Sequence, residues 1–102
     1  MPERVQAALL ELLPAGDTSA TAVARELAVS TRTLQRRLTE EGTTFQGVRE
    51  RTREALARHY LTRSSVPPAE IGFLLGYGDP NSFYRAFRDW TGDTPARVRA
   101  GA

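Results

Sequence analysis

Apolar residues recur along the chain at the three- and four-residue intervals typical of amphipathic α-helices. The clearest stripe is formed by Phe83, Phe87 and Trp90, which lie at i, i+4 and i+7 and are expected in the core. Asp79 stands where a helix N-cap would accept backbone N–H bonds, and Gly92 stands where the helix would end. No strand-like alternation competes with this pattern. The spacing therefore predicts an all-α fold of about seven helices.

Capping and breaking residues set the expected limits of these helices. Ser19, Ser30 and Thr94 are N-cap candidates, while Pro14 and the segment Ser-Ser-Val-Pro-Pro at 64–68 interrupt the helical pattern. Helices are predicted over residues 3–13, a short stretch ending near 27, 31–41, 45–63, 68–75, 80–91 and 95–99.

The pattern repeats once within the chain, at separations of 48 to 50 residues. The corresponding pairs are Val23 and Ile71, Leu27 and Leu75, Leu34 and Phe83, Leu38 and Phe87, Gly42 and Gly92, and Thr44 and Thr94. Each copy combines a short helix, a tight turn and a longer capped helix, which is a helix-turn-helix. We expect one domain over residues 1–102, with the first copy at about 19–42, a linker helix at about 45–63 and the second copy at about 67–92.

The longer helix of each copy has an apolar face and a polar face. The expected outward positions are Arg32, Gln35, Arg36 and Thr39 in the first copy, and Asn81, Tyr84, Arg85 and Arg88 in the second. An α-helix fits the major groove of DNA, where Arg pairs bidentately with guanine and Gln with adenine. The two polar faces therefore predict two recognition helices for double-stranded DNA.

The linker helix has a length suited to two such readers. Its 19 predicted residues span roughly 28 Å at about 1.5 Å per residue. Two major-groove readers on one side of a duplex usually lie about 34–36 Å apart. The linker is thus expected to hold the two recognition helices one turn of DNA apart.

These segments resemble the DNA-binding domain of the AraC/XylS family of bacterial transcription regulators, over about residues 5–99. The first copy reads VARELAVSTRTLQRRLTEEGTTF, and the second, which is similar to the family's C-terminal signature, reads IGFLLGYGDPNSFYRAFRDWTGDTP. The linker carries Arg53, Ala57 and Leu61 at the family's usual spacing. Tyr60 replaces a usual leucine and Gly72 a usual alanine, which we interpret as packing changes. The resemblance implies sequence-specific binding of one domain to two adjacent major-groove segments.

Carried over by position, the resemblance assigns roles to individual residues. Base contacts fall to Arg32, Gln35 and Arg36 in the first recognition helix and to Asn81 and Arg85 in the second. The first helix is expected to supply more of the base specificity. Phosphate contacts are assigned to Ser30, Thr31, Arg37, Arg49, Tyr84 and Arg88.

Ordinary surface roles compete with these assignments. Ion pairs at i, i+4 would join Arg36 to Glu40, Arg37 to Glu41, Arg85 to Asp89 and Glu54 to Arg58, and exposed pairs of this kind contribute only about 0.3–0.5 kcal/mol. Arg53 has a further alternative, a contact with a carboxylate inside the fold. The alternative function is a helical protein-interaction module that binds an acidic partner through the same side chains.

Composition excludes several other classes of function. The chain has no cysteine and one histidine, His59, so it offers no nucleophile–base or metal constellation, and we expect neither an enzyme nor a cofactor. All 14 basic residues are arginines, and residues 45–65 contain five of them against two glutamates. That concentration of positive charge suits a phosphate-facing surface. No apolar run approaches the roughly 18 residues of a membrane helix. Together with the resemblance to bacterial regulators, this implies a bacterial cytoplasmic location, on the nucleoid when bound to DNA.

Regulation is expected to depend on parts outside this sequence. Family members usually carry an effector-binding or dimerisation domain ahead of this one, whereas here Met1 and Pro2 lead directly into the first helix. We expect a C-terminal fragment of a longer regulator, or alternatively a naturally short one. RNA polymerase is the expected further partner if the outcome is activation.

Overall fold

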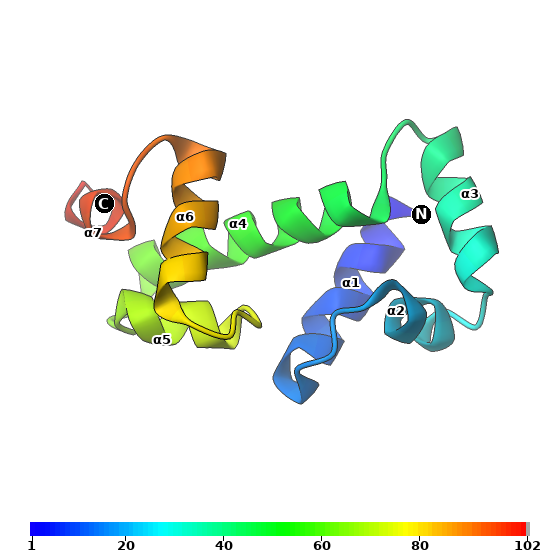
Figure 1. Ribbon diagram of the computed structural model, residues 1–102, viewed down its shortest axis with the longest axis horizontal. Coiled ribbons are helices and arrows are strands. Elements are labelled where there is room, and N and C mark those ends of the chain that lie inside the picture. Colours follow the sequence, from blue (N-terminus) through cyan, green and yellow to red (C-terminus); the bar gives the residue numbers. More distant parts are fainter. Residues whose placement is uncertain (102) are drawn as a thin grey trace. The chain divides into compact units, whose positions relative to one another are not determined.

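The computed structural model describes residues 1–101, and every regular element in that range is helical (Figure 1). The elements are α1 (Pro2–Leu12), the 3-10 turn η1 (Leu13–Ala15), α2 (Ala20–Glu26), α3 (Thr31–Glu40), α4 (Phe45–Arg63), α5 (Pro68–Leu74), α6 (Pro80–Thr91) and α7 (Pro95–Ala100). The predicted all-α class with about seven helices is confirmed. The chain divides into two compact units, residues 1–52 and 53–102, with α4 beginning in the first and ending in the second.

The first unit packs α1, α2, α3 and the start of α4 around one apolar cluster. Its buried members are Val5, Ala8, Leu9, Val23, Ala24, Leu34, Leu38 and Val48. Leu34 and Leu38 have no solvent exposure, as their inward positions on the predicted helix require. The opposite face of α3 is therefore the one that this unit leaves to solvent.

The second unit has its own cluster, built from the end of α4 together with α5 and α6. Its buried members are Ala57, Leu61, Ile71, Leu75, Phe83 and Phe87. Phe83 and Phe87 are fully buried, and their rings lie 5.9 Å apart in an edge-to-face arrangement. Trp90 packs against this cluster but is only half-buried, so the expectation that it is a core residue holds in part. Its position in the last turn of α6 explains the difference, because the helix ends one residue later.

The four predicted N-caps are confirmed. The hydroxyl of Ser19 accepts a hydrogen bond from the Ala22 amide at 3.1 Å, and that of Ser30 accepts one from the Thr33 amide at 3.0 Å. Asp79 accepts from the Ser82 amide at 2.8 Å, and Thr94 from the Arg97 amide at 3.2 Å. These bonds fix the first residues of α2, α3, α6 and α7, since each satisfies an amide that has no partner within its helix.

The sequence repeat extends to the backbone of the two helix-turn-helix turns. Three amide-to-carbonyl bonds close the first turn, from Leu27 to Val23, Ala28 to Arg25 and Val29 to Ala24, and the same three bonds recur 48 residues later, from Leu75 to Ile71, Gly76 to Phe73 and Tyr77 to Gly72. The central residue is left-handed in both turns, with φ of 57° at Ala28 and 91° at Gly76. The two copies therefore share a turn geometry as well as an apolar pattern.

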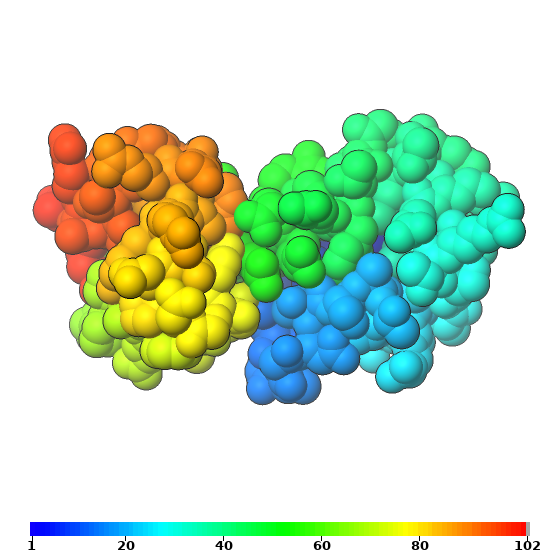
Figure 2. Space-filling view, in the orientation of Figure 1, coloured from blue at the N-terminus to red at the C-terminus, as the bar shows by residue number. Residues whose placement is uncertain are grey.

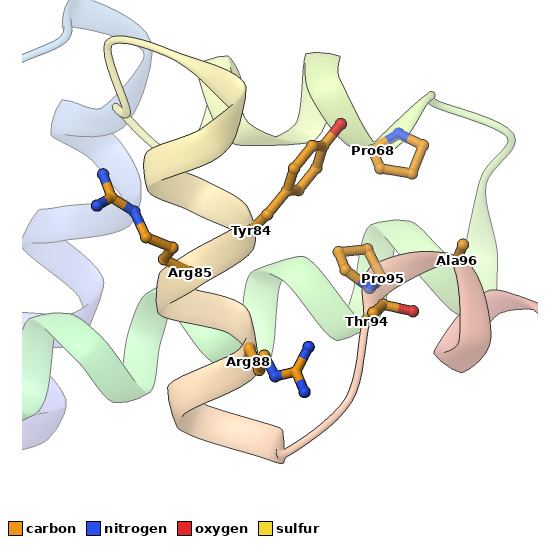
Figure 3. Close-up of a pocket in the computed structure, with 7 residues that line it drawn as sticks. All are labelled: Pro68, Tyr84, Arg85, Arg88, Thr94, Pro95 and Ala96. Atoms are coloured by element: carbon orange, nitrogen blue, oxygen red, sulfur yellow. The ribbon is translucent and has the colours of Figure 1, made fainter.

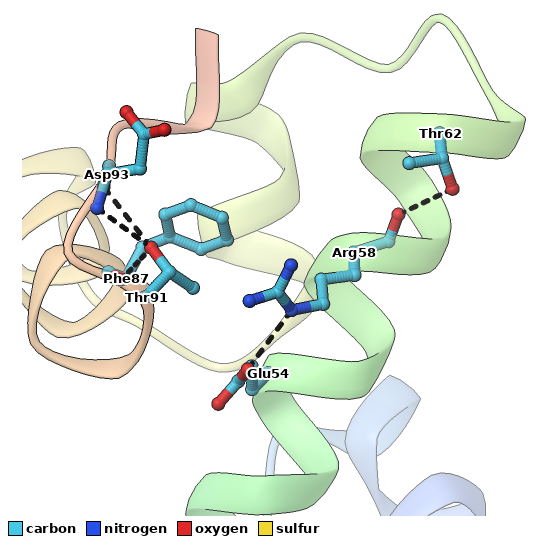
Figure 4. Close-up of polar contacts among 6 residues, drawn as sticks. All are labelled: Glu54, Arg58, Thr62, Phe87, Thr91 and Asp93. Carbon is cyan, nitrogen blue, oxygen red and sulfur yellow. Dashed lines mark hydrogen bonds and ion pairs between the residues drawn. The ribbon is translucent and has the colours of Figure 1, made fainter. Parts of the chain in front are cut away.

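Polar side chains reinforce the helix ends in the second unit (Figure 4). Arg58 pairs with Glu54 at 3.0 Å along α4, as predicted, and the Thr62 hydroxyl donates to the Arg58 carbonyl at 2.8 Å. After α6, the Thr91 hydroxyl donates to the Phe87 carbonyl at 2.9 Å and accepts from the Asp93 amide at 3.1 Å. These bonds guide the chain out of α6 towards α7.

Candidate nucleic-acid interface

The polar face of α3 is a row of exposed side chains on a buried support. Arg32, Gln35 and Arg36 are exposed, whereas Leu34 and Leu38 of the same helix are fully buried. The atoms of α3, cyan in Figure 2, lie uncovered at the surface in that view. The predicted base-reading residues of the first copy thus lie together on a helix whose other face is fixed by packing.

The start of α3 is held by Ser30, one of the predicted phosphate contacts. Its hydroxyl accepts from the Thr33 amide at 3.0 Å and donates to the Thr33 hydroxyl at 2.9 Å. Thr31, the first residue of the helix, is half-buried. Ser30 therefore has an intramolecular role that fixes the entry into α3.

The arginines of α3 have weak intramolecular partners. Arg36 lies 3.9 Å from Glu40, with both side chains 64% exposed, so water screens the pair and its contribution to stability is small. Arg37 is half-buried, and Glu41 contacts the Met1 amino group at 3.0 Å instead of Arg37. Both guanidinium groups can therefore bind a phosphate or a base edge with little loss of intramolecular interaction energy.

The polar face of α6 is arranged in the same way. Asn81, Arg85 and Arg88 are exposed, and within residues 1–101 neither Arg85 nor Arg88 forms an ion pair, so the expected pairing of Arg85 with Asp89 is absent there. Tyr84 is half-buried, with its ring 5.9 Å from that of Phe83. This face carries two arginines that form no ion pair within residues 1–101, beside a tyrosine.

Asp79 is the N-cap residue of α6. Hydrogen bonds from the Ser82 amide, and then from the Ser82 hydroxyl, lower the pKa of this exposed carboxyl below its ordinary value. The carboxylate is consequently ionised at neutral pH, where it caps the helix that begins at Pro80.

Three arginines of α4 and α7 are turned towards the backbone. Arg49 is half-buried, its Nη1 donates to the Thr18 carbonyl at 3.4 Å, and its guanidinium lies 5.6 Å from the centre of the Phe45 ring. Arg53 donates from Nε to the Leu75 carbonyl at 3.1 Å. Arg99 donates to the carbonyls of Tyr60, Leu61 and Ser64, each at 3.2 Å. The guanidinium group of Arg53 also lies 4.7 Å from the centre of the Tyr77 ring.

Beside α6 lies a hollow of about 400 Å³, which we call the α6 groove (Figure 3). It is lined by Pro68, Tyr84, Arg85, Arg88, Thr94, Pro95 and Ala96. The Tyr84 ring extends from α6 towards Pro68, and the Arg88 side chain extends towards Thr94. The groove is mainly apolar, with a guanidinium group at one side.

Beside α3 lies a larger and more polar hollow of about 610 Å³, which we call the α3 groove. It is lined by Ser19, Ala20, Gln35, Thr39, Thr44, Phe45, Gln46 and Arg49. Gln46 and Thr44 were not among the candidate site residues, although the recurrence of Thr44 at Thr94 was a signal in the sequence. The groove shares Gln35 with the polar face of α3.

Other kinds of site are not found in the part of the chain that the structure describes. None of its groups of His, Cys, Asp or Glu could hold a metal ion. Its helices are also too short or too polar for any of them to cross a bilayer.

Comparison with known proteins gives consistent matches. A family model described as a helix-turn-helix domain matches residues 23–101. The ornithine utilization regulator of Pseudomonas aeruginosa is 49% identical over 76 residues, which is 74% of this chain and 22% of that protein. The crystal structure of the transcriptional regulator CdpR from Pseudomonas aeruginosa aligns with a TM-score of 0.82 at 40% identity, covering 97% of this chain and 31% of that one.

A structure solved with DNA also matches. The DNA-binding domain of AdpA, described as a global transcriptional factor and crystallised in complex with a target DNA, aligns with a TM-score of 0.77 at 26% identity. The alignment covers 97% of this chain and 88% of the AdpA chain. By contrast, the chain spans only about a quarter of the length of the curated relatives it matches, 22% and 29% of the first two.

Proposed function

Because the chain belongs to the helix-turn-helix family of AraC-type transcriptional regulators, we propose that it binds double-stranded DNA sequence-specifically and thereby regulates transcription. The observation that carries the proposal is the row of exposed Arg32, Gln35 and Arg36 on α3, backed by fully buried leucines. The structural similarity to the AdpA DNA-binding domain, which was crystallised in complex with a target DNA, also supports the proposal. Membership of a family of regulators agrees with the expectation that the chain is not an enzyme.

In this proposal α3 enters the major groove as the principal reader. Arg36 and Arg32 donate to the O6 and N7 atoms of guanine, and Gln35 pairs with adenine, since each has the hydrogen-bonding geometry of that base edge. The packing of Leu34 and Leu38 holds the helix rigid, so these side chains are presented without a cost of ordering the backbone.

The second reader is α6, with Asn81 and Arg85 on its exposed face. Its cap at Asp79 and its packing through Phe83 and Phe87 fix the helix in the same way. We infer that it discriminates less than α3, because it offers fewer side chains suited to base edges.

The two readers are proposed to engage adjacent segments of the major groove. α4 is one uninterrupted helix of 19 residues, about 28 Å long at about 1.5 Å per residue. A connector of that length is compatible with readers about one turn of B-DNA apart. Residues 1–102 would then act as one DNA-binding domain.

Phosphate contacts are proposed for Ser30, Thr31, Arg37, Arg49, Tyr84 and Arg88. Such contacts supply affinity and register, and leave sequence preference to the base-reading residues. Arg88 is the best supported of them, because it is exposed and its charge is not compensated within the described residues.

The longer protein implied by the relatives adds further partners. An effector-binding or dimerisation domain elsewhere in such a protein would control this domain, and an activator would also contact RNA polymerase. We propose that the longer protein is located in the bacterial cytoplasm, on the nucleoid when it is bound to DNA.

Selection of bound duplexes from a randomised DNA pool, at about physiological salt, tests the proposed function. Enrichment of short conserved blocks is expected, since only a DNA reader prefers one duplex over another of equal length. Recovery of unenriched sequences by a folded protein would support the alternative, an interaction module for an acidic partner, and contradict the proposal.

A further inference from the structure

Thr39 completes the polar face of α3, beside the three residues proposed to read bases. It is exposed and lies seven residues after Arg32, four after Gln35 and three after Arg36, so all four share one side of the helix. When that side faces the major groove, Thr39 faces it as well. What Thr39 can contact there depends on which of its groups is left to meet a ligand.

The hydroxyl proton of Thr39 is used within the helix. Its Oγ1 donates to the Gln35 carbonyl at 2.9 Å, a bond between residues four apart along α3. A threonine hydroxyl has one proton, so while this bond is made the oxygen can accept hydrogen bonds but cannot donate another. The group that Thr39 has left to offer is the methyl group at Cγ2. The side chain is therefore a small apolar contact on a face that is otherwise polar.

The surroundings of Thr39 are unfavourable for a phosphate. α3 ends at Glu40, and the C-terminal end of a helix carries partial negative charge. The exposed carboxylate of Glu40 has Arg36 as its neighbour at 3.9 Å, and it loses that neighbour when Arg36 turns to a base. A phosphate oxygen would meet this negative charge without receiving a proton from Thr39. An apolar group of the DNA meets no such repulsion.

Among the base-edge groups of the major groove, the apolar one is the 5-methyl group of thymine. It projects from the base into the groove, so a side chain as short as threonine can contact it. Gln35, one helical turn before Thr39, has the hydrogen-bonding geometry for adenine. Four residues rise about 6 Å along a helix, which is close to the length of about two base pairs.

We propose that the Thr39 methyl group contacts the 5-methyl group of a thymine within about two base pairs of the adenine that Gln35 contacts. The proposal rests on the proposed function and adds to it a specificity-determining residue whose contribution is apolar. The bond from Thr39 to the Gln35 carbonyl turns the methyl group, instead of the hydroxyl proton, towards the DNA.

Deoxyuridine isolates this contact, because it differs from thymidine only in lacking the 5-methyl group and still pairs with adenine. The α3 block is the selected block whose base preference changes in Arg36→Ala. Each thymine of this block is replaced in turn by deoxyuridine, and binding of the whole chain is titrated. One replacement is expected to weaken the wild type roughly fourfold, the effect of one methyl-sized group removed from an apolar contact. Thymines outside the selected blocks are the control and should give no change.

Two substitutions separate the methyl group of Thr39 from its hydroxyl. Thr39→Val keeps the methyl group, and it is expected to bind as the wild type does and to remain sensitive to the same deoxyuridine. Thr39→Ser keeps the hydroxyl, and it is expected to bind the thymine duplex roughly fourfold more weakly and to be insensitive to that deoxyuridine. Thermal unfolding checks that both variants are folded.

A hydroxyl that contacts the DNA would give the reverse order, with Thr39→Val weakened and Thr39→Ser unaffected, and would overturn the proposal. A wild type that tolerates deoxyuridine throughout the α3 block, an α3 block without thymine, or equal sensitivity in the wild type and Thr39→Ser would also overturn it. These results would leave the sequence preference of the wild type, and with it the proposed function, in place. A wild type that prefers no duplex would overturn the proposed function itself.

Discussion

At the level of single residues, the arginines differ in what each guanidinium group contacts. Arg53 and Arg99 donate to backbone carbonyls of their own unit, so their loss would be felt in the fold. Arg36 has only an exposed carboxylate 3.9 Å away. The Arg36 guanidinium is therefore available to a ligand, and its loss is expected to lower DNA affinity and not the stability of the fold.

Substitution of Arg36 by alanine tests this division. We predict that specific binding weakens by about 1–3 kcal/mol and that preference relaxes at one base pair, because a bidentate contact with guanine is lost. The unfolding midpoint should not change, since the pair with Glu40 is exposed on both sides. Titration of the selected duplex and its single-base variants measures both effects. An equal loss on every sequence would make Arg36 a phosphate contact.

The cap of α6 should respond to pH. The folded-state pKa of Asp79 is lowered by hydrogen bonds from Ser82, so its contribution to stability is fully present above the ordinary carboxyl pKa of 3.8. That contribution is lost as pH falls through the lower folded-state pKa. Carboxyl chemical shifts followed by NMR should place the Asp79 midpoint below that of an exposed aspartate, and the difference should become smaller in Ser82→Pro, which removes both Ser82 donors, the largest causes of the shift. An Asp79 midpoint at the ordinary value would contradict the cap.

At the element scale, the two turns share one backbone geometry but differ in the residue that must be left-handed. Ala28 has φ of 57°, where a side chain costs about 1–2 kcal/mol, while its counterpart Gly76 has no such cost. We predict that Ala28→Gly stabilises the chain by about 0.5–1 kcal/mol and that Gly76→Ala destabilises it by about 1 kcal/mol. Chemical unfolding of both variants measures this. Destabilisation by Ala28→Gly would show that the Ala28 side chain has a role beyond the turn.

The second copy brings α5 and α6 together at a glycine. A Cβ on Gly72 would lie 2.9 Å from the Phe83 Cβ, so Gly72→Ala forces the two helices apart and should destabilise the chain by about 1–3 kcal/mol. Phe83→Leu should not rescue it, because leucine retains the Cβ. Gly78→Ala is the control, since nothing lies within 4 Å of its added Cβ. Equal unfolding energies for Gly72→Ala and Gly78→Ala would refute the close approach.

Elements were easier to predict from the sequence than individual contacts. Caps and helical spacing are local, so Ser30 and Asp79 could be assigned before the structure. Whether an arginine faces solvent or a carbonyl depends on residues far along the chain, as with Arg49 and Thr18. Trp90 continues the stripe of Phe83 and Phe87 but lies in the final turn of α6, where less of the unit remains to cover it. The grooves were missed because each combines three elements.

At the scale of the whole molecule, the chain carries two similar units on one continuous helix. The first unit presents α3, with a polar groove beside it, and the second presents α6, with an apolar groove. The alignments cover 22% and 29% of the first two curated relatives, and we propose that regulation resides in a longer protein of that kind. The central claim for this chain is that both readers engage a single duplex.

The measurement that tests this claim most directly is affinity as a function of the spacing between the two selected blocks. With two readers fixed about one turn apart, insertion of about 5 bp places the blocks on opposite sides of the duplex. Affinity is then expected to fall to that of a duplex containing the α3 block alone. Unchanged affinity after the insertion would contradict it, because the second unit would then contribute no contact tied to the first.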